Sequence, residues 1–134
     1  MASEVVVFGD PEAAVRAWLN PRITPVKVST EVPDPRPNEL VKVTVTGGFD
    51  PNLVTETPRL TFECWALTSV RASEICREVK AYVKAMNGET VNGVFVRAVR
   101  TVGAPVSFPD PQTTLPRYQY TAELSCRYVS VGDD

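Results

Sequence analysis

The sequence predicts an α+β fold: one antiparallel or mixed sheet with helices packed mainly on one face and two long proline-rich hairpin arms. Three observations indicate this. Segments of alternating apolar and polar residues occur in runs, two other segments have apolar residues at helical spacing, and prolines cluster in two connections. The expected order is α-β-β-β-α-β-β, in a single domain over residues 1–134.

The composition is that of an ordinary globular domain. The 134 residues are 43% hydrophobic and 22% charged, with a net charge of −2 and no basic stripe of the kind that nucleic-acid binding needs. The longest apolar runs, such as residues 5–8, are much shorter than a membrane-spanning helix, and Met1 to Glu4 lacks the features of a signal peptide. We therefore expect a soluble protein made in a cytoplasm, with neither a membrane nor a specific nucleic-acid sequence among its partners.

The first expected helix begins at Asp10, whose side chain can cap it, and continues through Pro11 and Glu12. Asn20-Pro21 is expected to end it. Its apolar residues share one stripe: Ala14, Val15, Trp18 and Leu19.

Three strands are expected next. Residues 26–32 and 41–46 alternate between apolar and polar side chains, which predicts two half-buried strands paired antiparallel. Gly47-Gly48 is expected to end the second, followed by a loop over residues 49–58. Residues 59–67 form the third strand, with these inward positions: Leu60, Phe62, Cys64 and Ala66.

The clearest helical pattern begins at Thr68 or Ser69 and ends at Asn87-Gly88. Its apolar positions recur every three or four residues: Ala72, Ile75, Cys76, Val79, Tyr82 or Val83, and Met86. Two strands follow, over residues 94–102 and 117–128, and residues 132–134 are a polar tail. The inward positions expected in the first of these strands are Val94, Val96, Ala98 and Val102.

The proline-rich arms are residues 33–37 and 105–116. Proline fixes φ and removes a donor, so we expect semi-rigid arms that contact neighbouring proteins. The polar sheet face, where we expect Trp65, Phe95 and Val99 to be exposed, is a second candidate contact surface, unless the first helix covers part of it. The candidate inter-subunit and tube-contact residues are Asp34, Arg36, Trp65, Phe95, Arg97, Phe108, Asp110 and Arg127.

No motif indicates a catalytic, cofactor or metal site. Histidine is absent, and neither a P-loop nor a dinucleotide-binding glycine motif occurs. The three cysteines, Cys64, Cys76 and Cys126, fall on apolar faces, which predicts buried thiols. Asp34 and Asp110 lie between prolines, where aspartate commonly forms turns, and no ligand spacing supports metal binding by them.

Paired carboxylates remain as a possible acid and base. The candidates are Glu63 and Glu123, on the polar side of their strands. Cross-strand ion pairs with Arg97 and Arg127 explain both glutamates adequately.

Three segments resemble the tail terminator (tail completion) proteins of long-tailed bacteriophages, in particular those of actinobacterial phages. Phe8-Gly-Asp-Pro-Glu-Ala-Ala-Val-Arg-Ala-Trp-Leu is similar to their first helix, and Leu60-Thr-Phe-Glu-Cys-Trp-Ala, with the helix after it, to their strand-then-helix centre. Arg117-Tyr-Gln-Tyr-Thr-Ala-Glu-Leu resembles their final strand.

The resemblance implies a structural virion protein of the tail or neck, assembled in the host bacterial cytoplasm. Such proteins form a ring, typically a hexamer, that caps the head-proximal end of the tail tube, ends tube polymerisation and mediates head-tail joining. The implied partners are further copies of the chain, the major tail tube protein and the head-tail connector or stopper protein, with DNA passing through the ring. The resemblance implies no catalytic residues and no cofactor.

Three alternatives stay open. A head-completion or connector-stopper protein of the neck shares the small size and the ring. A small hydrolase or nucleotide-modifying enzyme would need acids or nucleophiles that converge in a pocket. A host-binding adaptor would use the arms to hold one cellular partner and would be monomeric.

Overall fold

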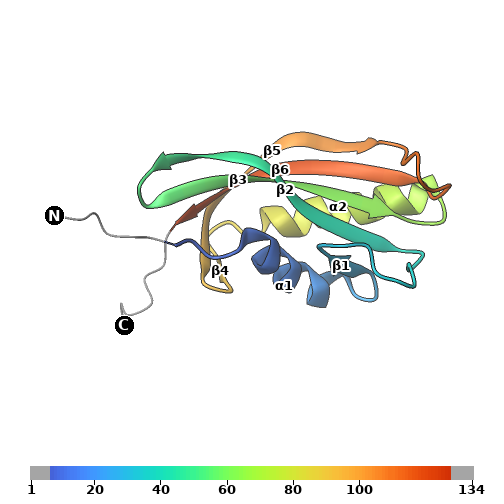
Figure 1. Ribbon diagram of the computed structural model, residues 1–134, viewed down its shortest axis with the longest axis horizontal. Helices are drawn as coiled ribbons and strands as arrows, with labels where there is room; N and C mark the ends of the chain where they lie inside the picture. The colour runs from blue at the N-terminus through green and yellow to red at the C-terminus, as the bar shows by residue number, and fades with distance from the viewer. Residues whose placement is uncertain (1–6, 128–134) are drawn as a thin grey trace.

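The structure, a computed structural model, describes residues 7–127 and contains two helices and a six-stranded mixed sheet (Figure 1). The elements are α1 (Pro11–Ile23), β1 (Lys27–Ser29), β2 (Leu40–Asn52), β3 (Thr55–Trp65), α2 (Ser69–Lys84), β4 (Thr90–Val91), β5 (Val94–Ser107) and β6 (Arg117–Arg127). The α+β class is confirmed, and the order matches the expectation apart from the additional short strand β4. Neither helix within residues 7–127 is long and apolar enough to cross a membrane.

The strands lie in the order β1-β2-β3-β6-β5-β4, which places β3 and β6 at the centre. All neighbours are antiparallel except β1, which runs parallel to β2 with Val28 opposite Val41. The expected antiparallel pairing of the first two strands is therefore wrong. The Asn20 side chain bonds both the N–H and the carbonyl of Val28, at 3.0 and 3.2 Å, and so occupies the outer edge of β1 as a neighbouring strand would. Residues 30–39 then return the chain to the start of β2.

The loop expected over residues 49–58 is a hairpin instead. β2 continues through Gly47 and Gly48 to Asn52, and β3 begins at Thr55. The pairing shifts register between Val45 and Gly47, which marks a bulge rather than the end of a strand. Gly48 is required here, because a Cβ at its φ of +140° would lie 2.5 Å from the Thr57 carbonyl oxygen. Figure 1 shows this hairpin extending past the helices.

Both helices begin where the sequence indicates. In α1, Asp10 Oδ1 accepts a hydrogen bond from the Glu12 N–H at 2.9 Å, and in α2, Thr68 Oγ1 accepts one from the Arg71 N–H at 3.2 Å. The expected end of α1 at Asn20-Pro21 is wrong, since the helix includes Pro21 and runs to Ile23. Ile23 is buried in the core, and its burial favours this last turn.

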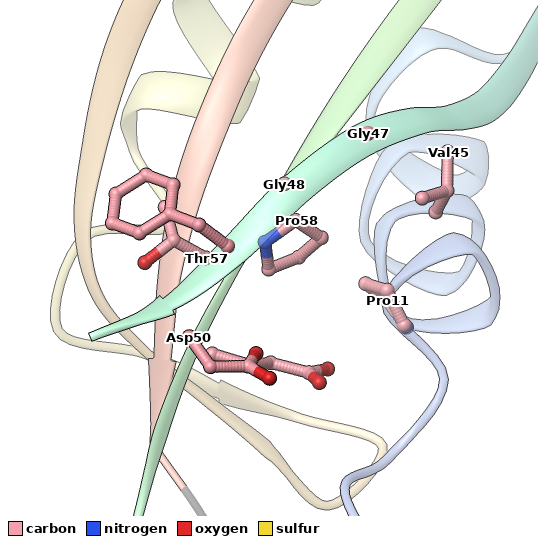
Figure 2. Close-up of a pocket in the computed structure, with 9 residues that line it drawn as sticks. Pro11, Val45, Gly47, Gly48, Asp50, Thr57 and Pro58 are labelled. Atoms are coloured by element: carbon pink, nitrogen blue, oxygen red, sulfur yellow. The ribbon is translucent and has the colours of Figure 1, made fainter. Parts of the chain in front are cut away.

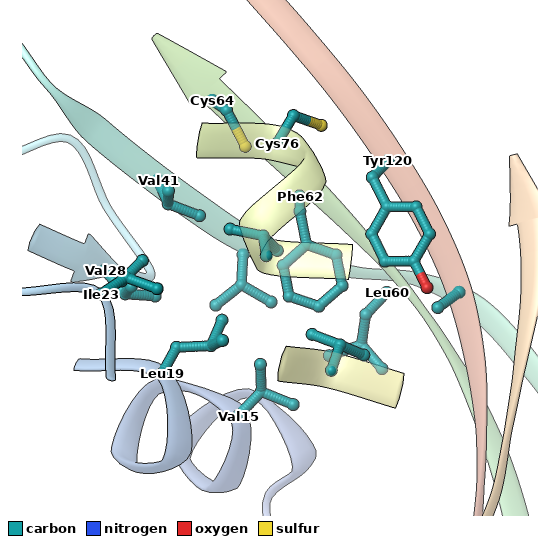
Figure 3. Packing of buried hydrophobic residues seen from close by; sticks show 14 of the residues in the cluster. Val15, Leu19, Ile23, Val28, Val41, Leu60, Phe62, Cys64, Cys76 and Tyr120 are labelled. Carbon is teal, nitrogen blue, oxygen red and sulfur yellow. The ribbon is translucent and has the colours of Figure 1, made fainter. Parts of the chain in front are cut away.

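The core lies between the sheet and the two helices, which are on the same side of it (Figure 1). Figure 3 shows Val15 and Leu19 of α1 beside Leu60 and Phe62 of β3. Phe62 stacks on Tyr120 of β6, with ring centroids 5.6 Å apart. The expected inward positions of β3 and α2 are confirmed, and of the two alternatives Tyr82 and Val83 it is Val83 that is buried. The buried positions are Leu60, Phe62, Cys64, Ala66, Ala72, Ile75, Cys76, Val79, Val83 and Met86.

The alternation expected in β5 fails after Val96. A register shift between Val96 and Ala98 inserts Arg97 as an extra residue, so that Ala98 is exposed and Val99 packs against the core. A bulge of this kind reverses which positions face inward, and it cannot be seen in the sequence of one strand. Val102 is likewise exposed. The expected positions at residues 1–4, Tyr128 and 132–134 lie outside the described residues.

We predict that the three buried thiols, Cys64, Cys76 and Cys126, react slowly in the native protein. Burial raises the pKa of Cys64 well above its usual value and, with a smaller contribution from Glu56, the pKa of Cys126 to about 12. A thiol-specific reagent at pH 8 should label the native chain at least about a hundredfold more slowly than the denatured chain, because only the thiolate reacts. Rapid labelling of any of the three in the native state would contradict this core.

Candidate interaction surfaces

The candidate contact residues separate into two groups at opposite ends of the sheet. Trp65 lies opposite Arg117 at one end, and Phe95 lies opposite Arg127 at the other. Arg36, Phe108 and Asp110 join the Trp65 end through contacts given below. Arg97 lies near the Phe95 end, and Asp34 is exposed on the first proline-rich loop. The structure therefore does not unite the candidate residues in one site.

Trp65 is only 2% exposed, so the expectation of an exposed tryptophan is wrong. Both proline-rich loops contact it. From the first loop, the Arg36 guanidinium lies 4.7 Å from the ring centroid. From the second, Asp110 Oδ2 accepts a hydrogen bond from Trp65 Nε1 at 3.3 Å. At these points the two loops lie against the sheet and shield its end.

Arg117 holds the second loop in place. Its Nη1 lies 2.7 Å from Glu63 Oε2 and 3.9 Å from Asp110 Oδ2, and its Nε donates to the Phe108 carbonyl at 2.8 Å. Asp110 Oδ1 also accepts from the Gln112 N–H at 2.9 Å. That hydrogen bond, together with the charge of Arg117, lowers the pKa of Asp110. Residues 108–112 are thus tied to the first residue of β6.

A cavity of about 400 Å³ opens beside this cluster. Its charged lining consists of Arg36, Lys42, Glu63, Asp110 and Arg117. Both carboxylates contact Arg117, whereas neither of the other two cations forms an ion pair within residues 7–127. Two guanidinium nitrogens of Arg36, Nε and Nη2, are buried with no hydrogen-bond partner in the described part of the chain. The cavity therefore has an excess of positive charge and suits a carboxylate or another anionic group.

The polar face of the sheet carries a buried carboxylate. Glu123 is 4% exposed and accepts from Arg59 at 2.9 Å and from Arg100 through two guanidinium nitrogens. These hydrogen bonds lower the pKa of Glu123, and those from Arg100 have the larger effect. The expected partners, Arg97 and Arg127, are wrong, because the bulge in β5 places Arg100 opposite Glu123.

Ion pairing itself is nevertheless the correct interpretation of both glutamates, since Glu63 is paired with Arg117.

The first helix does not cover this polar face. Leu19 is buried in the core, and Trp18 Nε1 donates to the Tyr82 carbonyl of α2 at 2.8 Å, so α1 packs beside α2 beneath the sheet.

The β2–β3 hairpin forms a further surface that the sequence did not indicate. A cavity of about 440 Å³ lies between it and the start of α1 (Figure 2). Asp50 and Glu56 both line the cavity, and burial and the negative charge of Asp50 raise the pKa of Glu56. Near the tip, Phe49 is 57% exposed and Leu53 is 90% exposed. Exposed apolar residues on an acidic hairpin are typical of a contact surface.

Two strands have edges without a neighbouring strand in the described part of the chain. β4 pairs only with Val94 and Phe95, which leaves the outer edge of β5 open from residue 97 onward. On the other side of the sheet, β1 pairs only with the first three residues of β2. The Val45 N–H donates to Glu12 Oε2 at 2.6 Å, which leaves residues 46–52 open.

The comparisons with known proteins add no family to this description. No protein-family model matches the sequence. No curated protein matches it either.

We predict that Asp110→Ala loosens the second proline-rich loop. In the parent chain, the hydrogen bonds of Asp110 with Trp65 and with the Gln112 N–H should together slow opening of the loop by about tenfold. The substitution removes both bonds, so the loop should open faster. Hydrogen exchange of residues 108–116, followed by mass spectrometry, should accelerate by that factor. Asp34→Ala is the matched control, because Asp34 forms no hydrogen bond or ion pair with residues 7–127. Equal exchange in the two variants would contradict the anchoring.

We also predict a pH-dependent contribution of Glu123 to stability. Because its pKa is lowered from the usual 4.5 in the folded state, ionised Glu123 stabilises the fold above pH 4.5, and this contribution is lost as the pH falls through the folded-state pKa. Glu123→Gln should lower the free energy of unfolding at pH 7 by roughly 1–3 kcal/mol. In urea titrations the difference from the parent chain should narrow below pH 4.5. Glu89→Gln, at an exposed position, is the control, and a pH-independent difference would contradict the assignment.

Proposed function

We propose that this chain is a structural virion protein of the tail-terminator type. In this proposal, copies of the chain form a ring at the head-proximal end of the tail tube, where the ring ends tube polymerisation and joins tail to head. The partners are other copies of the chain, the major tail tube protein and the connector or stopper protein.

The observation that carries the proposal is the pair of open edges on opposite sides of one sheet. A ring needs heterologous contacts, in which one surface of a subunit meets a different surface of the next. A free β2 edge and a free β5 edge are two such surfaces, separated by the width of the central strands. The resemblance of three segments to tail terminators supports the same function.

The cluster of Trp65 with Arg36, Asp110 and Arg117 supplies a candidate contact surface for the tube or the connector. Its two proline-rich loops, with Arg36 and Asp110 at the sheet end, would act as arms fixed before docking, and fixed loops lose less entropy when they bind. The anion-binding character of the neighbouring cavity favours an acidic segment of the partner. Asp34 and Phe108 lie on the same two loops and belong to this proposed surface.

The test combines the chain with assembling tail tubes of the same virion. Tubes polymerised with the chain should be shorter than tubes polymerised alone, and electron microscopy should show a ring at one end of each. Arg36→Ala should weaken this end binding by about tenfold, whereas Arg77→Ala, on the exposed face of α2, should not.

Other results of the same test would favour a different function for the chain. Binding to the connector with no effect on tube length would favour the head-completion or connector-stopper alternative. A monomer that binds neither partner would contradict a neck role and favour an adaptor or an enzyme.

A further inference from the structure

We infer that the acidic β2–β3 hairpin of one copy pairs with the basic outer edge of β5 in the next copy, so that the sheets join into one continuous intersubunit sheet. This inference rests on the proposed function and names the surfaces that would form the ring. The occupant of the open β5 edge is thus a second copy of this chain.

Strand direction permits this junction. β2 is antiparallel to β3, β3 to β6, and β6 to β5, so β2 and β5 run in opposite directions within one subunit. A copy placed by rotation so as to continue the sheet therefore sets its β5 antiparallel to β2 of its neighbour. Antiparallel pairing is the more stable of the two arrangements per residue.

Charge complementarity singles out the hairpin as the partner of β5. Residues 43–58 include Asp50 and Glu56 and no basic residue. β5 includes Arg97 and Arg100 and no acidic residue. Within residues 7–127 the two carboxylates form no ion pair, and Arg97 forms none either. Opposite charges on the two edges steer association and fix the register.

The heights of the two edges also agree. Asn52 of β2 lies opposite Thr55 of β3, and Phe95 of β5 lies opposite the β6 residue that pairs with Thr55. Asn52 and Phe95 are therefore at the same level along the sheet. Asp50, two residues earlier on β2, is therefore near the level of Arg97, two residues later on β5. A continuous sheet without a large shift along the strands brings Asp50 of one copy close to Arg97 of the next.

The negative charges of the two hairpin carboxylates repel each other in the single chain. Asp50 and Glu56 line the same cavity, and the pKa of Glu56 is raised partly by the charge of Asp50. An arginine from the neighbouring subunit would offset this repulsion. The exposed Phe49 and Leu53 beside these carboxylates would be covered in the same contact.

Charge reversal with rescue tests the inference on the full-length chain. Asp50→Lys and Arg97→Glu should each weaken self-association by about tenfold or more, measured by light scattering across a concentration series, or by the amount bound per tube end if assembly needs the tube. The double variant carrying both changes in one chain should recover most of the affinity. Glu78→Lys and Arg77→Glu are matched reversals at exposed positions on α2, away from both edges, and should leave association unchanged. Thermal unfolding should be the same for all variants, which excludes misfolding as the cause.

The outcomes separate this inference from the proposed function. Rings that form normally in both single variants would overturn the pairing while leaving a ring-forming role intact. A parent chain that stays monomeric, both alone and on tubes, would overturn both. Loss of tube binding in Asp50→Lys without loss of self-association would assign the hairpin to the tube protein and overturn pairing between copies.

Discussion

Pairing of β3 with β6 is the interaction on which the rest of the structure depends. The two strands lie more than fifty residues apart in the chain, yet they form the centre of the sheet, with Phe62 directly opposite Tyr120. Their inward side chains lie in the middle of the core beneath the sheet, and β2 and β5 pair on their outer sides. Because the helices cover one face only, the other face is left to polar side chains, where Glu123 is neutralised by two arginines.

One-sided burial also explains why local patterns predict part of this fold well. In α2 and β3, a residue faces inward because of its position in the element, so helical spacing or simple alternation identifies it. The end of α1 and the course of β5 follow from contacts that the pattern does not contain. Burial of Ile23 extends α1 beyond Pro21, and the extra residue Arg97 reverses the alternation of β5. The outer edge of β1 is likewise satisfied by Asn20, a residue on another element.

The candidate site was predictable to a similar, partial extent. The proline clusters point to Arg36 and Asp110 as candidate contact residues, and in the structure both contact Trp65. That meeting could not be predicted, because it needs the end of β3 to lie beside both loops, and the same contacts bury a tryptophan that alternation places on a polar face. The β2–β3 hairpin was missed because Gly47-Gly48 is typical of a turn. Its role as a bulge depends on the close approach of Thr57 from the opposite strand.

The outer edges of β2 and β5 are restricted by different groups, and this difference affects how copies of the chain could assemble. Open strand edges invite indiscriminate pairing, and proteins restrict them with short edge strands, bulges, charges and proline. Here Asn20 and Glu12 satisfy backbone groups of β1 and β2, so that only the distal part of β2 stays open. On β5, β4 covers the beginning of the strand and Pro105 lacks a donor near its end. The part of β5 between them is comparable in length to the open part of β2, and the two carry opposite charge. Both edges are thus limited to the lengths that a neighbouring copy could pair, which favours a defined intersubunit contact over open-ended aggregation.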